Sequence, residues 1–235
     1  MIAGAWASVY NPDGRVSPFF ERRPLHPSES QFMDSPQVHR SSKSEQRQED
    51  ILVAAALVFS AKGYRCSDVD EIAEKAGVGK GTVYRHFVNK ETLFLATVEK
   101  AMADLSAFVN DSLDKVTCPL TQFRLAMARY LQYFDRHPGT VELFIQERAE
   151  FRRHSKPLYF VYQASHREKW LELYRRLADA GQLRVQEPEQ ALDLIGDLLF
   201  GAVFSHRLAG SSASLAARSE SMMDMIFYGI LTPHQ

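Results

Sequence analysis

Cysteine is scarce in this chain of 235 residues, which contains only Cys66 and Cys118. The two lie far apart and form no Cys-x-x-Cys pair, so we expect neither a disulfide framework nor a zinc site. We interpret both as unreactive thiols of a protein in a reducing cytoplasm. The cysteine count therefore argues against the small disulfide-bonded and zinc-finger classes.

Long apolar runs and an excess of one charge are also missing. No run reaches the length of about 18 apolar residues that a membrane span needs. Residues 2–10 are apolar, but no cationic segment precedes them and residues 11–14 break the run, so we expect no signal peptide. The formal net charge is −1, so any affinity for DNA must come from a local basic patch. We expect a cytoplasmic protein.

A basic strip with no acidic residue extends from Lys75 to Lys90 and includes Lys80 and Arg85. The helix predicted before it has Ser67 as a candidate N-cap and ends at Gly77, which suits a left-handed C-terminal position. A second, short helix begins near residues 79–80. A helix, a glycine turn and a second helix form the helix-turn-helix motif, whose second helix presents residues to the major groove of DNA.

The short second helix carries side chains suited to DNA. Val83 and Phe87 are four residues apart and should face inward together, which leaves the other positions exposed. Lysine and arginine pair with guanine edges or phosphates, and hydroxyls and ring N–H groups bond phosphate oxygens. The candidate DNA-binding residues are Ser67, Lys80, Gly81, Thr82, Tyr84, Arg85, His86 and Lys90. The alternative is an ordinary solvated helix with scattered cations.

One motif in this segment is misleading. The sequence Gly79-Lys80-Gly81-Thr82 is similar to the end of a phosphate-binding loop. Such a loop requires an earlier glycine, where this chain has Glu74, and a strand before it, where a helix is predicted. We therefore expect no nucleotide site here.

Residues 47–95 as a whole resemble the TetR family of bacterial transcriptional regulators. The resemblance rests on several short runs. They are Ile51…Ala55…Phe59…Gly63-Tyr64, Ile72-Ala73…Ala76-Gly77-Val78, Gly81-Thr82-Val83-Tyr84-Arg85-His86-Phe87, and Asn89-Lys90-Glu91…Leu93. Two departures are Gly79, where the family often has serine, and Cys66-Ser67-Asp68, where a Thr-Ser pair is common. The resemblance implies a double-stranded DNA operator as partner and a homodimer that responds to a small molecule.

After about residue 46 every segment has helical periodicity, and no strand pattern competes. The other predicted helices cover residues 46–62, 91–115, 121–136, 141–153, 158–180, 188–209 and 213–230. The fold class is all-α with about nine helices. The predicted domains are a disordered tail (1–45), a helix-turn-helix DNA-binding domain (46–92) and a helical effector-binding and dimerisation domain (93–232). We interpret the tail, rich in Pro, Ser, Arg and Gln, as passive or as a mis-assigned start rather than as a DNA-binding arm.

Aromatic side chains are dense between residues 120 and 175 and could enclose a mostly apolar effector cavity. The family resemblance places such a pocket among residues 90–180. The candidate pocket residues are Phe123, Met127, Tyr130, Phe134, Phe144, Phe151, Tyr162 and Trp170. The alternative for each of them is ordinary helix–helix core.

The last two predicted helices carry more apolar surface than one core needs, which favours an isologous dimer. Small residues at Gly196, Gly201 and Ala202 would let a partner helix approach. The resemblance implies a four-helix bundle with two helices from each subunit. The candidate interface residues are Leu192, Ile195, Leu199, Val203, Met222, Met225 and Ile226. The alternative is a monomer core closed by these helices.

The sequence therefore predicts a repressor that a small, largely apolar effector releases from a palindromic operator. An architectural or activating DNA-binding protein without an effector is the alternative. An enzyme is not expected, because no nucleophile–base motif, metal spacing or cofactor loop is present. No cofactor or metal is predicted.

Overall fold

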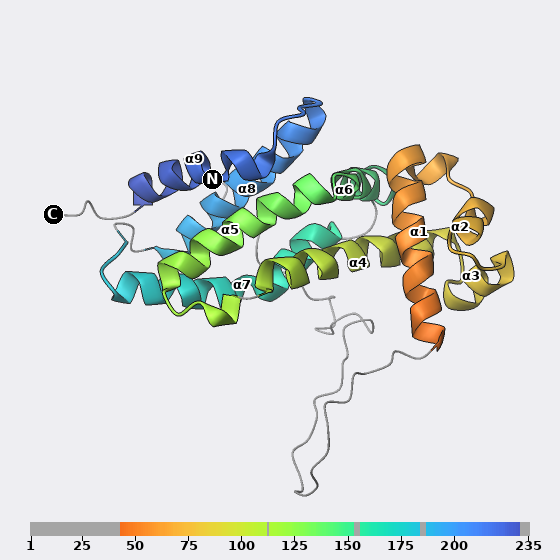
Figure 1. The fold of residues 1–235 in the computed structure, drawn as a ribbon, viewed down its shortest axis with the longest axis horizontal. Coiled ribbons are helices and arrows are strands. Elements are labelled where there is room, and N and C mark those ends of the chain that lie inside the picture. Colours follow the sequence, from red (N-terminus) through yellow and green to blue (C-terminus); the bar gives the residue numbers. More distant parts are fainter. Residues whose placement is uncertain (1–42, 112, 153–155, 184–186, 231–235) are drawn as a thin grey trace, which may run out of the picture. The chain divides into compact units, whose positions relative to one another are not determined.

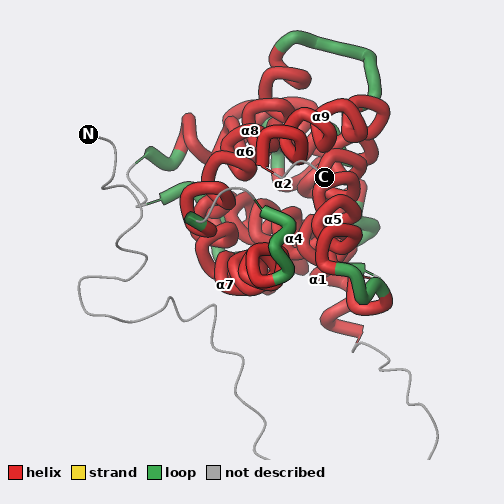
Figure 2. The backbone as a smooth tube through the Cα atoms, turned by 90° about the vertical axis from the view of Figure 1, so that its left-hand side faces the viewer, coloured by secondary structure: helices red, strands yellow, loops and turns green. Residues whose placement is uncertain are grey.

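The structure is a computed structural model that describes residues 43–111, 113–152, 156–183 and 187–230. Residues 1–42, which make up almost all of the predicted tail, lie outside the described residues. Helices and the loops that join them make up the described chain (Figure 2). The helices are α1 (Lys43–Cys66), α2 (Val69–Lys75), α3 (Lys80–His86), α4 (Lys90–Asn110), α5 (Pro119–Arg136), α6 (Gly139–Glu150), α7 (Leu158–Asp179), α8 (Pro188–Leu208) and α9 (Leu215–Ile230). The predicted all-α class with about nine helices is confirmed for this part of the chain.

Helices α1, α2 and α3 lie together at one end, and α4 leads from them to the remaining helices (Figure 1). Gly77 follows the end of α2, and its φ of 67° places it in the left-handed region as predicted. Its N–H bonds the Glu74 carbonyl and the Val78 N–H bonds the Ala73 carbonyl, both at 3.0 Å. This pair of bonds is a Schellman motif, which turns the chain sharply before α3.

The N-cap of α2 differs from the prediction. Asp68, not Ser67, is the cap, and its carboxylate accepts a hydrogen bond from the Asp70 N–H at 3.0 Å. The Ser67 hydroxyl instead donates to the Gly63 carbonyl at 2.6 Å. Gly63 marks a kink near the end of α1, with a φ of 81°. Ser67 is therefore used to satisfy the carbonyls that this kink leaves without helical partners.

Several helix ends also differ from the prediction. Helix α1 begins at Lys43 rather than residue 46, and α4 ends at Asn110 rather than residue 115. Residues 113–115 form the short 3-10 helix η2 (Leu113–Lys115), whose Leu113 is buried. The break at Asp111, which has a φ of −57° and a ψ of 126°, ends α4 before the apolar pattern ends.

The hydrophobic core runs from helices α1 to α3 into the rest of the fold. Phe59 of α1 and Phe94 of α4 are both fully buried, and their rings meet edge to face with centroids 5.1 Å apart. Helix α5 contacts α4, α7, α8 and α9. Among the described residues, no helix has both the length and the apolar character needed to cross a membrane.

Candidate DNA-binding surface and effector region

The short helix α3 presents one buried and one exposed face. Val83 is 1% exposed and Phe87 is 6% exposed, so both face the core as predicted. Tyr84 is 43% exposed, and Gly81 and Arg85 are also exposed. A methyl group added at Gly81 would meet no atom within 4 Å. This surface is open to a second molecule, and it carries a hydroxyl and a guanidinium that can bond phosphates or bases.

Lys80, the first residue of α3, is paired with an acidic side chain of α2. Its Nζ lies 2.7 Å from Asp70 Oδ2, and both side chains are about half exposed. The hydrogen bond to Asp70 raises the pKa of Lys80. Lys80 is therefore charged at neutral pH, but the carboxylate beside it offsets part of that charge at the surface of α3.

Ser67 and Lys90 have other partners than those the sequence predicts. Ser67 is 5% exposed and its hydroxyl is directed to Gly63, so its side chain does not belong to a DNA-binding surface. Lys90 donates to the Arg65 carbonyl at 3.2 Å, and its Nζ lies 4.9 Å from the centre of the Tyr64 ring. Lys90 thus ties the start of α4 to the end of α1. Thr82 and His86 are half-buried on α3.

The start of α4 is fixed by a capping box. The Asn89 side chain accepts from the Thr92 N–H at 2.8 Å, and the Asn89 N–H donates to Thr92 Oγ1 at 3.1 Å. These reciprocal bonds satisfy backbone donors at the helix end. They set the direction in which α4 leaves the DNA-binding helices.

A second connection joins the DNA-binding helices to the rest of the chain through α6. Gln146 donates to the Phe59 carbonyl at 2.9 Å, and Arg65 Nε donates to both oxygens of Glu150 at 2.8 and 2.9 Å. At Gly139 the approach is so close that an added Cβ would lie 2.9 Å from the Ser60 side chain. Helix α1 is therefore held along the length of α6.

Side chains of α5, α6, α7 and α8 form an aromatic cluster centred on Tyr159. Its ring lies 5.5 Å from Phe144 and 5.0 Å from Phe200, centre to centre. Its hydroxyl lies 2.8 Å from the Tyr130 hydroxyl and 3.4 Å from Gln163 Nε2. Burial raises the pKa of Tyr159 to about 12, so both phenols stay neutral. The cluster is a packed apolar interior that contains a few polar groups.

The structure brings together only part of the predicted effector pocket. Tyr130, Phe134 and Phe144 lie near one another. Phe123 and Met127 belong to a second core cluster with residues of α7, α8 and α9. The other three lie elsewhere: Phe151 packs on Tyr64 and Phe94, Tyr162 stacks on His166, and Trp170 lies between the two clusters. Tyr159 was absent from the predicted set. Its place in the first turn of α7, just after Pro157, could have indicated which side of that helix faces inward.

Glu147 is a buried carboxylate on the inner face of α6 and is 5% exposed. Its Oε1 accepts from the Leu158 N–H at 2.8 Å, which satisfies a donor at the start of α7. Its Oε2 has no hydrogen-bond partner within the described residues. Burial raises the pKa of Glu147, and the carboxylate of Glu99 on α4 adds to the rise. The sequence alone gives no sign that this glutamate is buried.

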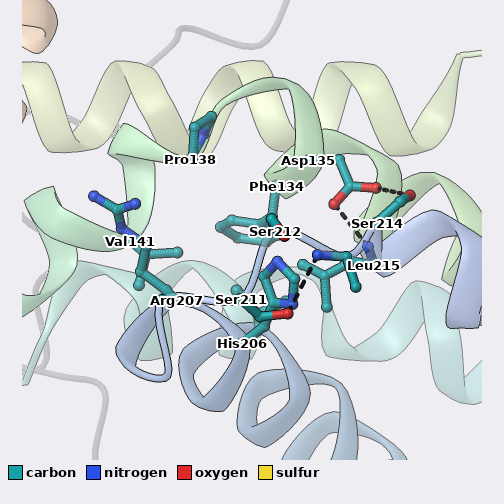
Figure 3. Close-up of a pocket in the computed structure, with 13 residues that line it drawn as sticks. Phe134, Asp135, Pro138, Val141, His206, Arg207, Ser211, Ser212, Ser214 and Leu215 are labelled. Atoms are coloured by element: carbon teal, nitrogen blue, oxygen red, sulfur yellow. Dashed lines mark hydrogen bonds between the residues drawn. The ribbon is translucent and has the colours of Figure 1, made fainter.

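A half-open cavity of about 410 Å³ lies elsewhere, where α5 meets α6 and α8 turns into α9. Figure 3 shows Arg207 at one end of it, Asp135 and Ser214 at the other, and the His206 ring between them. Of the eight predicted pocket residues, only Phe134 lines this cavity. The cavity is therefore not the site that the aromatic density indicated.

The predicted interface residues divide between the inside and the outside of the subunit. Ile195, Val203 and Ile226 are each less than 10% exposed and belong to the subunit's own core, so they are unavailable to a partner. Leu192, Leu199 and Met222 are half-buried, and Met225 is 77% exposed. The other large apolar side chains exposed on α8 and α9 are Leu194, Leu198, Leu208 and Tyr228. Helix α8 is apolar on nearly every side, so its sequence alone did not show which stripe faces outward.

Comparison with known proteins bears on the helices α1 to α4. The family model of the bacterial regulatory proteins of the tetR family matches residues 51–97, which covers most of α1, all of α2 and α3, and the start of α4. This segment of the chain matches the TetR family. TetR-family regulators are DNA-binding transcription factors that act as dimers, and they are not enzymes.

The named relatives include both a transcriptional activator and a transcriptional repressor. The transcriptional activator FasR of Mycolicibacterium smegmatis is 32% identical over 91 residues, which cover 39% of this chain and 42% of FasR. The chain thus matches less than half of that protein. The transcriptional repressor KstR2 of Mycobacterium tuberculosis is 25% identical over 152 residues, which cover 63% of this chain and 74% of KstR2.

A solved structure extends the likeness beyond the DNA-binding helices. The transcriptional regulator FadR of Bacillus subtilis, in complex with stearoyl-CoA, superposes with a TM-score of 0.64 over 77% of this chain and 98% of FadR. The two sequences are 20% identical. At that identity the likeness is one of fold, and it includes the helices that surround the Tyr159 cluster.

Proposed function

We propose that this protein is a homodimeric TetR-family repressor that a small, largely apolar effector releases from a palindromic operator. The observation that carries the proposal is the double attachment of α6. One part of this helix holds α1 through Gly139, Gln146 and Glu150. Another part places Phe144 in the aromatic cluster around Tyr159. A molecule that rearranges the cluster therefore acts on a helix attached to the DNA-binding domain.

The proposed DNA contacts come from the exposed side of α3 and the start of α4. Lys80, Gly81, Tyr84 and Arg85 are exposed there, with Thr82 and His86 at the edges of the same surface. A dimer places two such helices about 34 Å apart, one turn of DNA, so the operator should have two-fold symmetry. This spacing is the quantity that an effector would change.

The proposed dimer surface consists of Leu194 and Leu198 on α8 with Met225 and Tyr228 on α9. All four are more than half exposed in the single subunit. A large apolar patch exposed on a single subunit marks a site of interaction with another molecule. This set replaces the buried residues Ile195, Val203 and Ile226 of the sequence-based prediction.

Repression by release requires the effector to prefer the subunit spacing that does not fit DNA. A 10- to 100-fold preference corresponds to about 1.4–2.7 kcal/mol of coupling between the two sites. FadR is held with stearoyl-CoA in its structure, so stearoyl-CoA and free fatty acids are the first effectors to test here.

The first experiment selects binding sites from random double-stranded DNA with the purified protein. A palindromic motif that disappears in Tyr84→Ala supports operator binding through α3. Titration of the bound operator with stearoyl-CoA and with stearate, followed by fluorescence anisotropy, then tests release. Operator affinity that no apolar ligand of a broad panel alters would overturn the effector half of the proposal and leave operator binding intact.

Activation is the second candidate, because the relative FasR is named an activator. The two candidates differ in transcription from a promoter that carries the selected operator. Repression lowers the transcript when the protein is added to purified polymerase, whereas activation raises it.

A further inference from the structure

The cavity between α5, α6 and the α8–α9 turn has the size and floor of a small-molecule site. Its volume is about 410 Å³, within the range of ligand pockets. The floor consists of Phe134, Val141, Val203 and Leu215, each less than 5% exposed. These side chains close the bottom of the cavity, so a ligand that enters it lies over apolar groups.

Both carboxylate oxygens of Asp135, which lines the cavity, already accept hydrogen bonds from the chain. Asp135 Oδ1 accepts from the Leu215 N–H at 2.8 Å. Its Oδ2 accepts from the Ala216 N–H at 2.8 Å and from the Ser214 hydroxyl at 2.6 Å. Asp135 therefore serves the start of α9, and its negative charge faces the positive end of that helix. It is not a group that would attract a cationic ligand.

Arg207 and His206 also line the cavity. Arg207 donates its Nε to Glu142 at 2.7 Å, and a guanidinium has four further N–H groups on its terminal nitrogens. The Nδ1 atom of His206 is buried and has no hydrogen-bond partner within the described residues. Figure 3 shows both side chains along one wall.

We propose that this cavity binds a small amphipathic organic acid. The carboxylate lies against Arg207 and His206, and the apolar body of the acid covers Phe134, Val141 and Val203. An inorganic anion such as phosphate would leave most of the volume and the whole apolar floor unused. The site is distinct from the proposed effector region around Tyr159, and its occupation can be measured without DNA.

Isothermal titration of the purified protein with matched pairs of probes tests the chemistry. The probes are benzoate with benzamide, octanoate with octanamide, and inorganic phosphate. At least one carboxylate should bind at least ten-fold more tightly than its amide and more tightly than phosphate. Equal affinity for acid and amide, tighter binding of phosphate, or no binding by either acid at millimolar concentration would overturn the proposal.

Two arginines of similar environment provide the matched variants. Arg207 and Arg175 are 43% and 42% exposed, and each lies 2.7 Å from a glutamate. Arg175 is on α7, outside the cavity lining. Arg207→Gln should weaken the binding of the carboxylate about ten-fold and leave the amide unaffected, whereas Arg175→Gln should change neither.

Glu142→Gln separates recognition from a purely structural role of the Arg207–Glu142 pair. Removal of Glu142 frees the guanidinium and takes away a competing negative charge, so the carboxylate should bind more tightly, by a few-fold. If the pair only held the cavity open, both Arg207→Gln and Glu142→Gln would weaken binding. That result would overturn the role given to Arg207. The unfolding temperature of each variant shows that the fold is kept.

Discussion

Among single residues, the ion pair between Lys80 and Asp70 controls how much positive charge α3 offers to DNA. The two atoms lie 2.7 Å apart at the surface, where an exposed pair is worth little for stability. The pair has a larger effect on the binding of DNA, because Lys80 would neutralise a phosphate. Each neutralised phosphate adds about 0.9 to the slope of log K against log salt. The pair therefore matters for DNA affinity more than for folding.

Asp70→Asn should strengthen operator binding several-fold at low salt, because Lys80 then meets phosphate without a competing carboxylate. The slope of log K against log salt should become steeper by up to about 1. Fluorescence anisotropy at several salt concentrations measures both quantities. Asp111→Asn is the matched control, since Asp111 also pairs with a cationic side chain, Arg129 at 3.1 Å, but lies at the end of α4. A similar change in both variants would contradict the local explanation.

Lys80→Ala distinguishes base recognition from phosphate binding. If Lys80 reads a base, its loss should relax the preference at one operator position and cost about 1–3 kcal/mol on the selected sequence. Competition binding with operators altered one base pair at a time gives this profile. Equal losses on every DNA sequence would show that Lys80 binds phosphate only.

Residue-level predictions succeeded where periodicity decided them. Val83 and Phe87 are buried because a four-residue spacing on a helix fixes a shared face. Ser67 was assigned wrongly because Ser67 and Asp68 are both good N-caps and adjacent in sequence. The choice depended on the kink at Gly63, whose carbonyl accepts the Ser67 hydroxyl. The sequence pattern does not show that α1 kinks at Gly63 and leaves this carbonyl free to accept.

Among whole elements, α6 is the helix that carries the buried carboxylate of Glu147. Its carboxylate joins α6 to the start of α7 and lies near Glu99 of α4. A buried group left without a partner costs about 1–3 kcal/mol. Glu147 therefore adds a pH-dependent term to the stability of the region between α4, α6 and α7.

Glu147→Gln should stabilise the protein increasingly as the pH rises above about 4.3, where the unfolded glutamate ionises. The raised pKa of Glu147 means that the folded state retains its proton longer than the unfolded state. The wild type therefore loses stability as the pH rises through the folded pKa, and glutamine avoids that loss. Above the folded pKa the difference should become constant.

Urea unfolding of the wild type and of Glu147→Gln between about pH 3.5 and pH 8, a range that includes the unfolded pKa, measures this difference. Glu168→Gln is the control, because the Glu168 side chain is 76% exposed. A difference between Glu147→Gln and wild type that stays flat across the whole range would contradict a raised pKa.

Element-level predictions from the sequence were good for helix number and weaker for helix faces. The apolar spacing gave every helix of the described chain, with ends displaced by a few residues. Aromatic density between residues 120 and 175 did not show which rings meet, because neighbouring residues on one helix face different partners. Tyr130 and Phe134 share a cluster, whereas Phe123 and Met127 pack on α9 and its neighbours. That division depends on how α5 lies between α4 and α9.

At the scale of the whole molecule, the proposed recognition of a two-fold operator requires two subunits. Leu194 and Leu198 are 58% and 54% exposed on α8 and are four residues apart, so they form one stripe. A dimer that buries this stripe keeps two α3 helices at a fixed spacing, and binding to the two half-sites is then a single event. Loss of the dimer should therefore affect DNA binding more than any single contact on α3.

Leu194→Glu combined with Leu198→Glu should convert the dimer into a monomer, because two charges would otherwise be buried without partners. Analytical ultracentrifugation measures the change in mass, and operator affinity should fall by at least ten-fold. Leu57→Glu is the matched control, since Leu57 is 56% exposed on α1 and lies outside the proposed interface. If the double variant still sediments as a dimer, α8 does not form the interface. If it is monomeric yet binds the operator as tightly as Leu57→Glu, two-subunit recognition is wrong.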